Sequence, residues 1–220
     1  MTKHESRRSL KDRFRGFLPV IVDIETAGVD PSSNALLEMC VVLINVNNQG
    51  VFYRESSHFE HIMPFEGAVL DAKSLEFNQI DPFQPLRFAL PEHQALQNLF
   101  IPIKRALKAS SCQRAVLVGH NAWFDLLFIK EALKRTQLKS PFHAFTCFDT
   151  ATLGGFFYGQ TVLAKAARAA GLHFDPKEAH SAIYDAEKTA DLFCVMLNTW
   201  HEIFEKTPCQ DSSMVYNSSE

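Results

Sequence analysis

Two of the acidic motifs of this chain follow apolar runs that have the composition of β-strands. Leu18-Pro-Val-Ile-Val22 is such a run, and Asp23 and Glu25 come directly after it. Side chains two residues apart on a strand point to the same face of the sheet, with Cα atoms roughly 6.6 Å apart. The two carboxylates therefore project together from the end of one strand.

Two further acidic motifs occur where we expect helices to begin. Asp125 ends the motif His120-Asn-Ala-Trp-Phe-Asp125, directly after the apolar run at 115–118, so its carboxylate can turn toward the first strand. His180 and Asp185 are five residues apart, which is a poor spacing for one face of a helix. We therefore expect His180 in the loop before the last helix and Asp185 pointing inward from the first turns of that helix.

Together these motifs supply four carboxylates and one imidazole. Magnesium prefers oxygen ligands and keeps several waters, so carboxylates from separate elements suit it better than a cage of His and Cys. Such a set can hold two Mg²⁺ ions, with Mn²⁺ as a substitute, and His180 can accept a proton from an attacking water. The expected chemistry is hydrolysis of phosphodiester bonds.

Each motif alone has an ordinary explanation. An Asp at the start of a helix, such as Asp125, is favoured by the helix dipole, and a bare Asp-x-Glu is common. His180 can simply precede its helix. Tyr184 is a rival for the base, but a tyrosine-type site would need a tyrosine four residues before Asp185, where Ser181 stands. The combination of the motifs favours a metal-dependent hydrolase.

The composition fits one domain with an ordinary core, since 46% of the 220 residues are hydrophobic and 21% are charged. The five cysteines are widely spaced and include no Cys-x-x-Cys pair. No stretch approaches the ~20 apolar residues of a membrane helix. The formal net charge of −3 argues weakly against indiscriminate binding of polyanions. We expect a cytoplasmic protein with reduced thiols.

Hydrophobic periodicity and turn residues predict a sheet flanked by helices. Strands are expected at 18–25, 36–46, 51–62, 115–118 and 145–148, with a hairpin turn at Asn47–Gly50. Helices are expected at 92–108, 123–137, 160–170 and 181–205. Pro102 should kink or split the first of these helices. Because the sheet begins antiparallel and later strands alternate with helices, we predict a mixed α/β sheet.

The chain divides into three segments by composition. Residues 1–15 form a basic N-terminal segment without the apolar region of a secretory signal. Residues 16–206 form one catalytic domain. Residues 207–220 are rich in Pro, Gln, Asp, Ser and Asn, which predicts a disordered tail.

The motif set resembles that of the DEDDh 3′→5′ exonucleases, which have an RNase H-like fold with a five-stranded sheet. Within that superfamily the chain is most similar to the bacterial ribonuclease T family, from about residue 10 to 200. The local matches are Asp12–Phe17, Val22–Gly28, Phe77–Asp81, Phe148–Thr150 and Gly159–Val162.

The resemblance implies a homodimeric, Mg²⁺-dependent exoribonuclease that trims the 3′ ends of tRNA and other stable RNAs. The implied metal site comprises Asp23, Glu25, Asp125 and Asp185 together with His180 as the general base. Two ions per site would activate the water and stabilise the leaving oxygen. Glu25 would also contact the terminal 3′-hydroxyl group.

The resemblance also implies two groups of RNA-binding residues. The terminal bases would stack on Phe77, Phe124 and Phe145, although core packing is the alternative for each. The RNA would be held near the other subunit's active site by a basic patch that comprises Arg13, Arg15, Lys108, Arg114 and Lys139.

Other positions are expected to have structural roles or to depart from the family pattern. Asp149 is expected to order a turn between a strand and a helix, and His58 and His61 are expected to be structural. Val29 stands where the family usually has another Phe, and Lys73 stands where an acid is typical. Both departures put the usual discrimination against 3′-terminal cytosine in doubt.

Three other functions remain open from the sequence. A proofreading-type DNA exonuclease, with single-stranded DNA as its substrate, or an oligoribonuclease would use the same metal site. A catalytically silent RNA-binding module that keeps the fold is less favoured, because a binding module gains nothing from four anions that face a phosphate.

Overall fold

The computed structural model describes residues 9–205, which fold around one five-stranded sheet. The strand order is β3-β2-β1-β4-β5. Neighbouring strands are antiparallel from β3 to β1 and parallel from β1 to β5, which confirms the mixed sheet. The strands are β1 (Phe17–Thr26), β2 (Leu36–Val46), β3 (Phe52–His61), β4 (Arg114–Gly119) and β5 (Phe142–Asp149).

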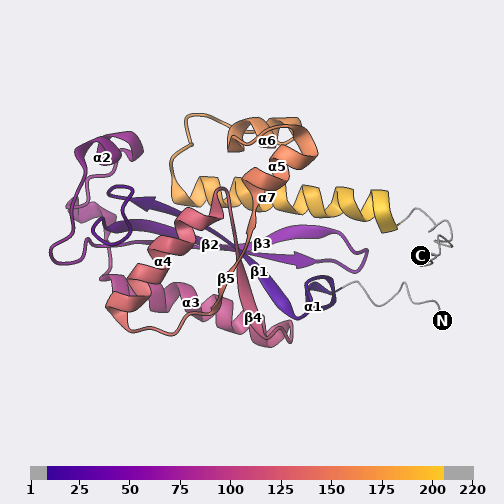
Figure 1. Ribbon diagram of the computed structural model, residues 1–220, viewed down its shortest axis with the longest axis horizontal. Helices are drawn as coiled ribbons and strands as arrows, with labels where there is room; N and C mark the ends of the chain where they lie inside the picture. The colour runs from indigo at the N-terminus through magenta and orange to yellow at the C-terminus, as the bar shows by residue number, and fades with distance from the viewer. Residues whose placement is uncertain (1–8, 206–220) are drawn as a thin grey trace, which may run out of the picture.

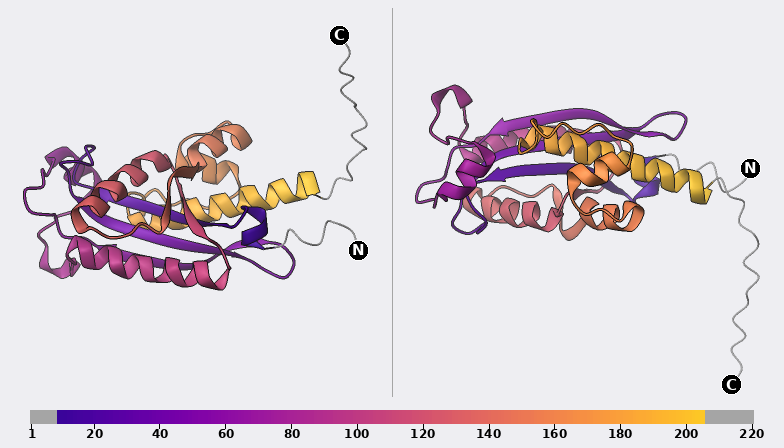
Figure 2. Two further views of the ribbon diagram at one scale, coloured as in Figure 1. Left: turned by 60° about the horizontal axis from the view of Figure 1, so that its bottom comes forward. Right: turned by 90° about the horizontal axis from the view of Figure 1, so that it is seen from above.

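Helices cover both faces of the sheet, as Figures 1 and 2 show. The long helix α7 packs against β1, β2 and β3 on one face, and α3 and α4 contact each other on the opposite face. The helices are α1 (Leu10–Arg13), α2 (Ala72–Asn78), α3 (Glu92–Ala109), α4 (Ala122–Thr136), α5 (Thr150–Tyr158), α6 (Leu163–Ala169) and α7 (Ala182–Trp200), with a 3₁₀-helix η2 (Pro85–Arg87) and a π-helix η3 (His201–Glu205).

The core lies on both sides of β1, the central strand. Val20, Ile21 and Val22 have no exposed surface, because a strand covered by helices on two faces buries consecutive residues rather than alternate ones. The hairpin turn between β2 and β3 is confirmed: Asn47 accepts hydrogen bonds from the backbone of Gln49 and Val51, and Gly50 adopts a φ of 79°.

Three sequence-based expectations differ from the observed elements. Helix α3 continues through Pro102 without splitting, because Leu99 and Ile103 bury their side chains on either side of it. Strand β5 begins at Phe142, three residues earlier than expected. Helices α1, α2 and α5 were not expected, since all three are short and α5 contains two glycines. The expected helix at 181–205 is helical to its end, since α7 ends at Trp200 and the π-helix η3 continues from His201 to Glu205.

The described part of the N-terminal segment packs on the domain. Leu10 and Phe14 are buried in the main core, and the Phe14 ring lies 5.6 Å from the Phe148 ring. The boundary between residues 15 and 16 stays a prediction. Residues 1–8 of the basic segment, and the tail predicted at 207–220, lie outside the described residues.

The expectations about free thiols and membrane helices can be compared with residues 9–205. The four cysteines within residues 9–205, namely Cys40, Cys112, Cys147 and Cys194, are free thiols. No helix among these residues combines the length and the apolar character needed to cross a membrane.

Candidate active site

The sheet brings the predicted acidic residues together at one end. Strands β1 and β4 are parallel neighbours, so their carboxyl ends meet at the same edge of the sheet. Asp23 and Glu25 lie near the end of β1, and Asp125 lies in the first turn of α4, directly after β4. Asp185 joins them from the first turn of α7, which packs on β1.

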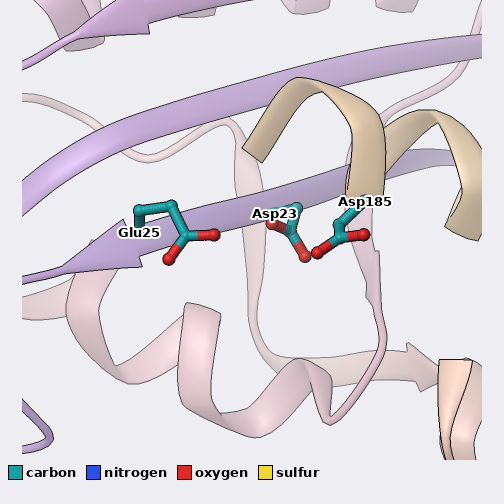
Figure 3. Close-up of side chains that lie close together, drawn as sticks. All are labelled: Asp23, Glu25 and Asp185. Carbon is teal, nitrogen blue, oxygen red and sulfur yellow. The ribbon is translucent and has the colours of Figure 1, made fainter. Parts of the chain in front are cut away.

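The carboxylates are close enough to share a bound cation. One oxygen from each of Asp23, Glu25 and Asp185 lies within 4.8 Å of the others. Figure 3 shows the Asp23 and Asp185 carboxylates facing each other, with Glu25 pointing toward them. Asp125 lines the same cleft of about 290 Å³ together with those three residues.

Burial and mutual repulsion disfavour the charged forms of the four carboxylates in the cleft. Burial and the neighbouring carboxylates, above all Asp125, raise the pKa of Asp23 well above its ordinary value. Burial likewise raises the pKa of Asp125 and Asp185. For Glu25, burial and the adjacent Glu38 raise the pKa to about 8. A cation in the cleft would favour the charged form of each carboxylate.

The donor set fits a hard divalent cation. All four side chains offer only oxygen, which is the ligand type that Mg²⁺ and Mn²⁺ take in proteins. Within residues 9–205, Asp185 Oδ1 is one of three buried side-chain atoms without a hydrogen-bond partner. A buried carboxylate oxygen without a partner is costly, and a bound cation would remove that cost.

His180 lies in the loop before α7, as expected, but outside the cleft. Its φ is 67°, and its backbone N–H donates to Asp185 Oδ2 over 3.0 Å. The exposed imidazole packs on Phe77, with ring centroids 4.3 Å apart. The structure therefore places His180 beside the carboxylates through its backbone, whereas its ring faces α2.

A hydrogen-bond network fixes the turn that carries Asp125. Asn121 adopts a left-handed conformation with a φ of 67°, and its N–H donates to the Asp149 carboxylate. Asp149 also accepts from the N–H of Ala151 and so caps α5, which supports its expected structural role. His120 Nε2 donates to the Thr161 carbonyl group over 2.8 Å. The α5–α6 loop is thereby tied to the cleft.

The three phenylalanines expected to stack bases lie at two different places. Phe124 lines the carboxylate cleft, and Phe77 is exposed on α2 next to His180. Phe145 is exposed on β5 and lines a second cavity of about 740 Å³ with Arg13 and Arg15. Within a single chain, Phe77 and Phe124 therefore lie at the end of the sheet that carries the carboxylates, and Phe145 does not.

The basic residues lie at the opposite end of the sheet from the carboxylates. Arg114 pairs with Phe17 where β4 and β1 start, about 20 Å along β1 from Asp23. Arg13 and Arg15 precede β1, Lys108 is in the last turn of α3, and Lys139 precedes β5. Among the described residues, none of these five side chains forms an ion pair.

Sequence reasoning missed three residues near Glu25, namely Glu38, Arg87 and Asn78. Glu38 pairs with Glu25 across β2 and β1, and Arg87 and His61 hold its carboxylate. Asn78 donates to the Thr26 carbonyl group beside Glu25. Strand pairing and loop packing bring these residues close to Glu25, and no local sequence pattern predicts that position. His58 lies within hydrogen-bonding distance of Ser56, so both histidines of β3 have structural partners.

Val29 and Lys73 are both exposed. Neither lines the carboxylate cleft.

Comparison with known proteins finds an exonuclease family model and relatives named Ribonuclease T. The RNase_T family model, described as an exonuclease, matches residues 20–193. A protein of Vibrio parahaemolyticus named Ribonuclease T is 52% identical over 202 residues, which are 91% of this chain and 94% of the relative. A protein of Marinobacter nauticus with the same name is 53% identical over 195 residues, which are 88% of each chain.

Solved structures share the fold at low identity. The nuclease domain of 3′hExo, described as a DEDDh family member and bound to rAMP, superposes with a TM-score of 0.64 at 22% identity, over 82% of this chain and 92% of that one. E. coli Exonuclease I in complex with a dT13 oligonucleotide superposes with a TM-score of 0.61 at 15% identity. The superposition covers 86% of this chain and 43% of Exonuclease I, and it supports the RNase H-like fold alone.

Proposed function

The chain belongs to the RNase_T exonuclease family, and from this membership and the carboxylate cleft we propose that it trims the 3′ ends of tRNA precursors and other stable RNAs. Family membership makes it a 3′→5′ exoribonuclease, a hydrolase of phosphodiester bonds. The substrate, the metal and the residue roles are the proposed part. The observation that carries the proposal is the convergence of Asp23, Glu25 and Asp185 within 4.8 Å.

Asp23, Glu25, Asp125 and Asp185 would hold two Mg²⁺ ions, which Mn²⁺ can replace. When bound, the ions supply activation of a water and stabilisation of the leaving 3′-oxygen. The partnerless Asp185 oxygen and the raised carboxylate pKa values support this assignment. A catalytically silent RNA-binding module is disfavoured, because four buried or half-buried carboxylates would repel a phosphate without contributing to binding.

His180 is proposed as the general base. Its loop position next to Asp185 supports this role, because rotation of the exposed side chain away from Phe77 can bring the imidazole over the cleft. An imidazole there would accept a proton from the attacking water. Glu25, held beside Asn78, is proposed to contact the terminal 3′-hydroxyl group, so that cleavage begins at a chain end.

Phe77 and Phe124 are proposed to stack the unpaired bases at the 3′ end. Each stacked base contributes on the order of 1–3 kcal/mol. Bases within a duplex would first have to unpair, so trimming should stall near a helix and short 3′ overhangs should be preferred. A 3′-phosphate should block the reaction by crowding the contact to Glu25.

The basic patch and Phe145 are proposed to hold RNA for the active site of a partner subunit in a homodimer. Two placements support this proposal. The patch is about 20 Å from Asp23 along β1, and Phe145 shares a cavity with Arg13 and Arg15 rather than with the carboxylates. A two-fold interface would present each patch to the partner's cleft. Cleavage of tRNA would place the enzyme in the cytoplasm.

A comparison of substrates tests the proposed function. Purified protein with Mg²⁺ would be given a tRNA precursor, single-stranded DNA and dinucleotides in parallel. Release of nucleoside 5′-monophosphates from the tRNA precursor at the highest rate is expected. A strong preference for dinucleotides would indicate an oligoribonuclease, and a preference for DNA would indicate a proofreading-type exonuclease.

A further inference from the structure

We propose that Trp123 is an additional base-stacking residue, which binds the nucleotide next to the one held at Phe124. The inference rests on the proposed RNA-trimming function and extends its binding site. Trp123 lies within the motif His120-Asn-Ala-Trp-Phe-Asp125, between the turn at Asn121 and the carboxylate of Asp125.

Trp123 is exposed although Ala122, the residue before it, is buried. Its side chain is 57% exposed, whereas Ala122 and Phe128 on the same helix are fully buried. An exposed tryptophan contributes little to the core, and the Trp123 side chain lines the cleft with Asp23, Glu25 and Asp185. A large aromatic surface is thus available within the site that would hold the scissile phosphate.

The orientation of the ring assigns it to a separate base. The rings of Trp123 and Phe124 have centroids 5.9 Å apart and an interplanar angle of 89°. A flat base that stacks on one ring would meet the other with its edge, so the two faces cannot share one base. Successive bases of a single strand can instead occupy the two faces, since every base has a π-face.

Two separate segments carry the aromatic residues that one RNA strand would pass. Phe77 lies on α2, beside Asn78 and the Glu25 end of the cleft, whereas Trp123 and Phe124 lie at the start of α4. A terminal nucleotide at Glu25 would contact the Phe77 side. The next two nucleotides, on its 5′ side, would then stack on Phe124 and Trp123 respectively. Loss of one stacked base should weaken binding about 5-fold to 150-fold.

Fluorescence provides a direct test, because the chain contains only two tryptophans. Trp200→Phe leaves Trp123 as the single emitter, and Asp23→Asn in the same protein prevents turnover. A short 3′-hydroxyl RNA would be titrated in the presence of Mg²⁺, with binding followed by the anisotropy of a label at its 5′ end. Quenching of the Trp123 emission in parallel with binding is expected, because stacking on a base quenches indole.

A double-mutant cycle identifies the nucleotide. Trp123→Ala, in the Asp23→Asn protein, would be compared with the parent on RNAs that carry one abasic residue at each of the last four positions. The penalty of Trp123→Ala should vanish at one position and persist at the others, and Trp123→Phe should retain most of the affinity. Leu127→Ala is the matched control, since Leu127 is exposed on the same helix but outside the cleft.

The outcomes separate this inference from the function on which it rests. RNA binding without quenching, together with affinity of Trp123→Ala within twofold of the parent, would overturn the role of Trp123 and leave the proposed function intact. Failure of the Asp23→Asn protein to bind RNA, together with absence of RNA cleavage by the wild type, would overturn both.

Discussion

The imidazole ring of His180 packs against the ring of Phe77, with centroids 4.3 Å apart and an interplanar angle of 55°. The proposed general base therefore covers a face of the proposed stacking residue. A terminal base can stack on that face only if His180 leaves it. Binding of the 3′ end and movement of His180 toward the carboxylates would then be coupled, because they compete for one surface.

This competition predicts a change in the NMR signal of His180. In an Asp23→Asn protein, a dinucleotide with a free 3′-hydroxyl group should shift the ring resonances of His180, because they leave the ring current of Phe77. In Phe77→Leu the free protein should already lack that contribution, and the shift on binding should be smaller. His180→Gln assigns the signal. An unchanged His180 resonance with the dinucleotide bound would refute the coupling.

The raised pKa of Glu25 predicts that the metal-free protein loses stability as pH rises. The ordinary pKa of a glutamate is 4.5, and that of Glu25 in the folded state is about 8. Between these two pH values, Glu25 keeps its proton in the folded state, whereas the unfolded chain has already released it. The free energy of unfolding should therefore fall across this window, by on the order of 2–4 kcal/mol from Glu25, with the same sign from Asp23 and Asp125.

Chemical denaturation in EDTA at several pH values measures this effect. Glu25→Gln should flatten the profile, and Glu66→Gln, an exposed carboxylate outside the cleft, should not. Mg²⁺ should restore stability mainly at high pH, where the carboxylates are charged. A stability that rises from pH 5 to 8 in EDTA would contradict the electrostatics described for the cleft.

Gly119 is predicted to be necessary for the position of Asp125. A Cβ atom at Gly119 would lie 3.2 Å from Asp125 Oδ2 and 3.1 Å from the Ala122 Cα atom. Gly119→Ala should cost about 1–3 kcal/mol of stability and displace the carboxylate, with a loss of at least tenfold in kcat. Gly155→Ala is the control, because its Cβ would meet only a Thr161 methyl group at 3.3 Å. Normal turnover of Gly119→Ala would show that this packing does not position Asp125.

Mixed dimers test whether the basic patch acts on the partner subunit. A patch variant with Arg15, Lys108 and Arg114 neutralised should bind RNA weakly, with the salt slope reduced by roughly 0.7 for each lost phosphate contact. Mixing it with Asp23→Asn creates heterodimers in which intact carboxylates face an intact patch across the interface. Partial recovery of tRNA trimming is expected. If each patch served its own chain, no heterodimer would contain a complete site and the mixture would stay inactive.

Local sequence pattern was sufficient for the acidic residues. The alternation of a strand placed Asp23 and Glu25 on one face, and the junction between β4 and α4 placed Asp125 near them. It was insufficient where distant segments meet. Glu38 lies opposite Glu25 only because of the β1–β2 register, and His180 meets Phe77 only because Phe77 lies on α2, a helix that was not expected.

In helix α3, burial outweighed the low helix propensity of proline. The helix tolerates Pro102 because apolar residues on either side of it pack on the sheet.

The two aspartates that follow strands have different roles. Asp149 follows a strand, as Asp125 does, yet it caps α5 and accepts from the backbone N–H of Asn121. The sequence motif alone does not distinguish these two uses of an aspartate.

The most direct test of the central claim follows single-nucleotide shortening of a 5′-labelled hairpin RNA with a short 3′ overhang. With Mg²⁺ we expect a ladder that shortens from the 3′ end and stops near the duplex, with nucleoside 5′-monophosphates as the released product. Shortening of the RNA should be abolished, with the fold retained, by each of Asp23→Asn, Asp125→Asn and Asp185→Asn. Glu66→Gln should leave the shortening intact. Shortening that persists in excess EDTA, near-normal rates from Asp185→Asn, or cleavage of a circular single strand would contradict the proposed mechanism.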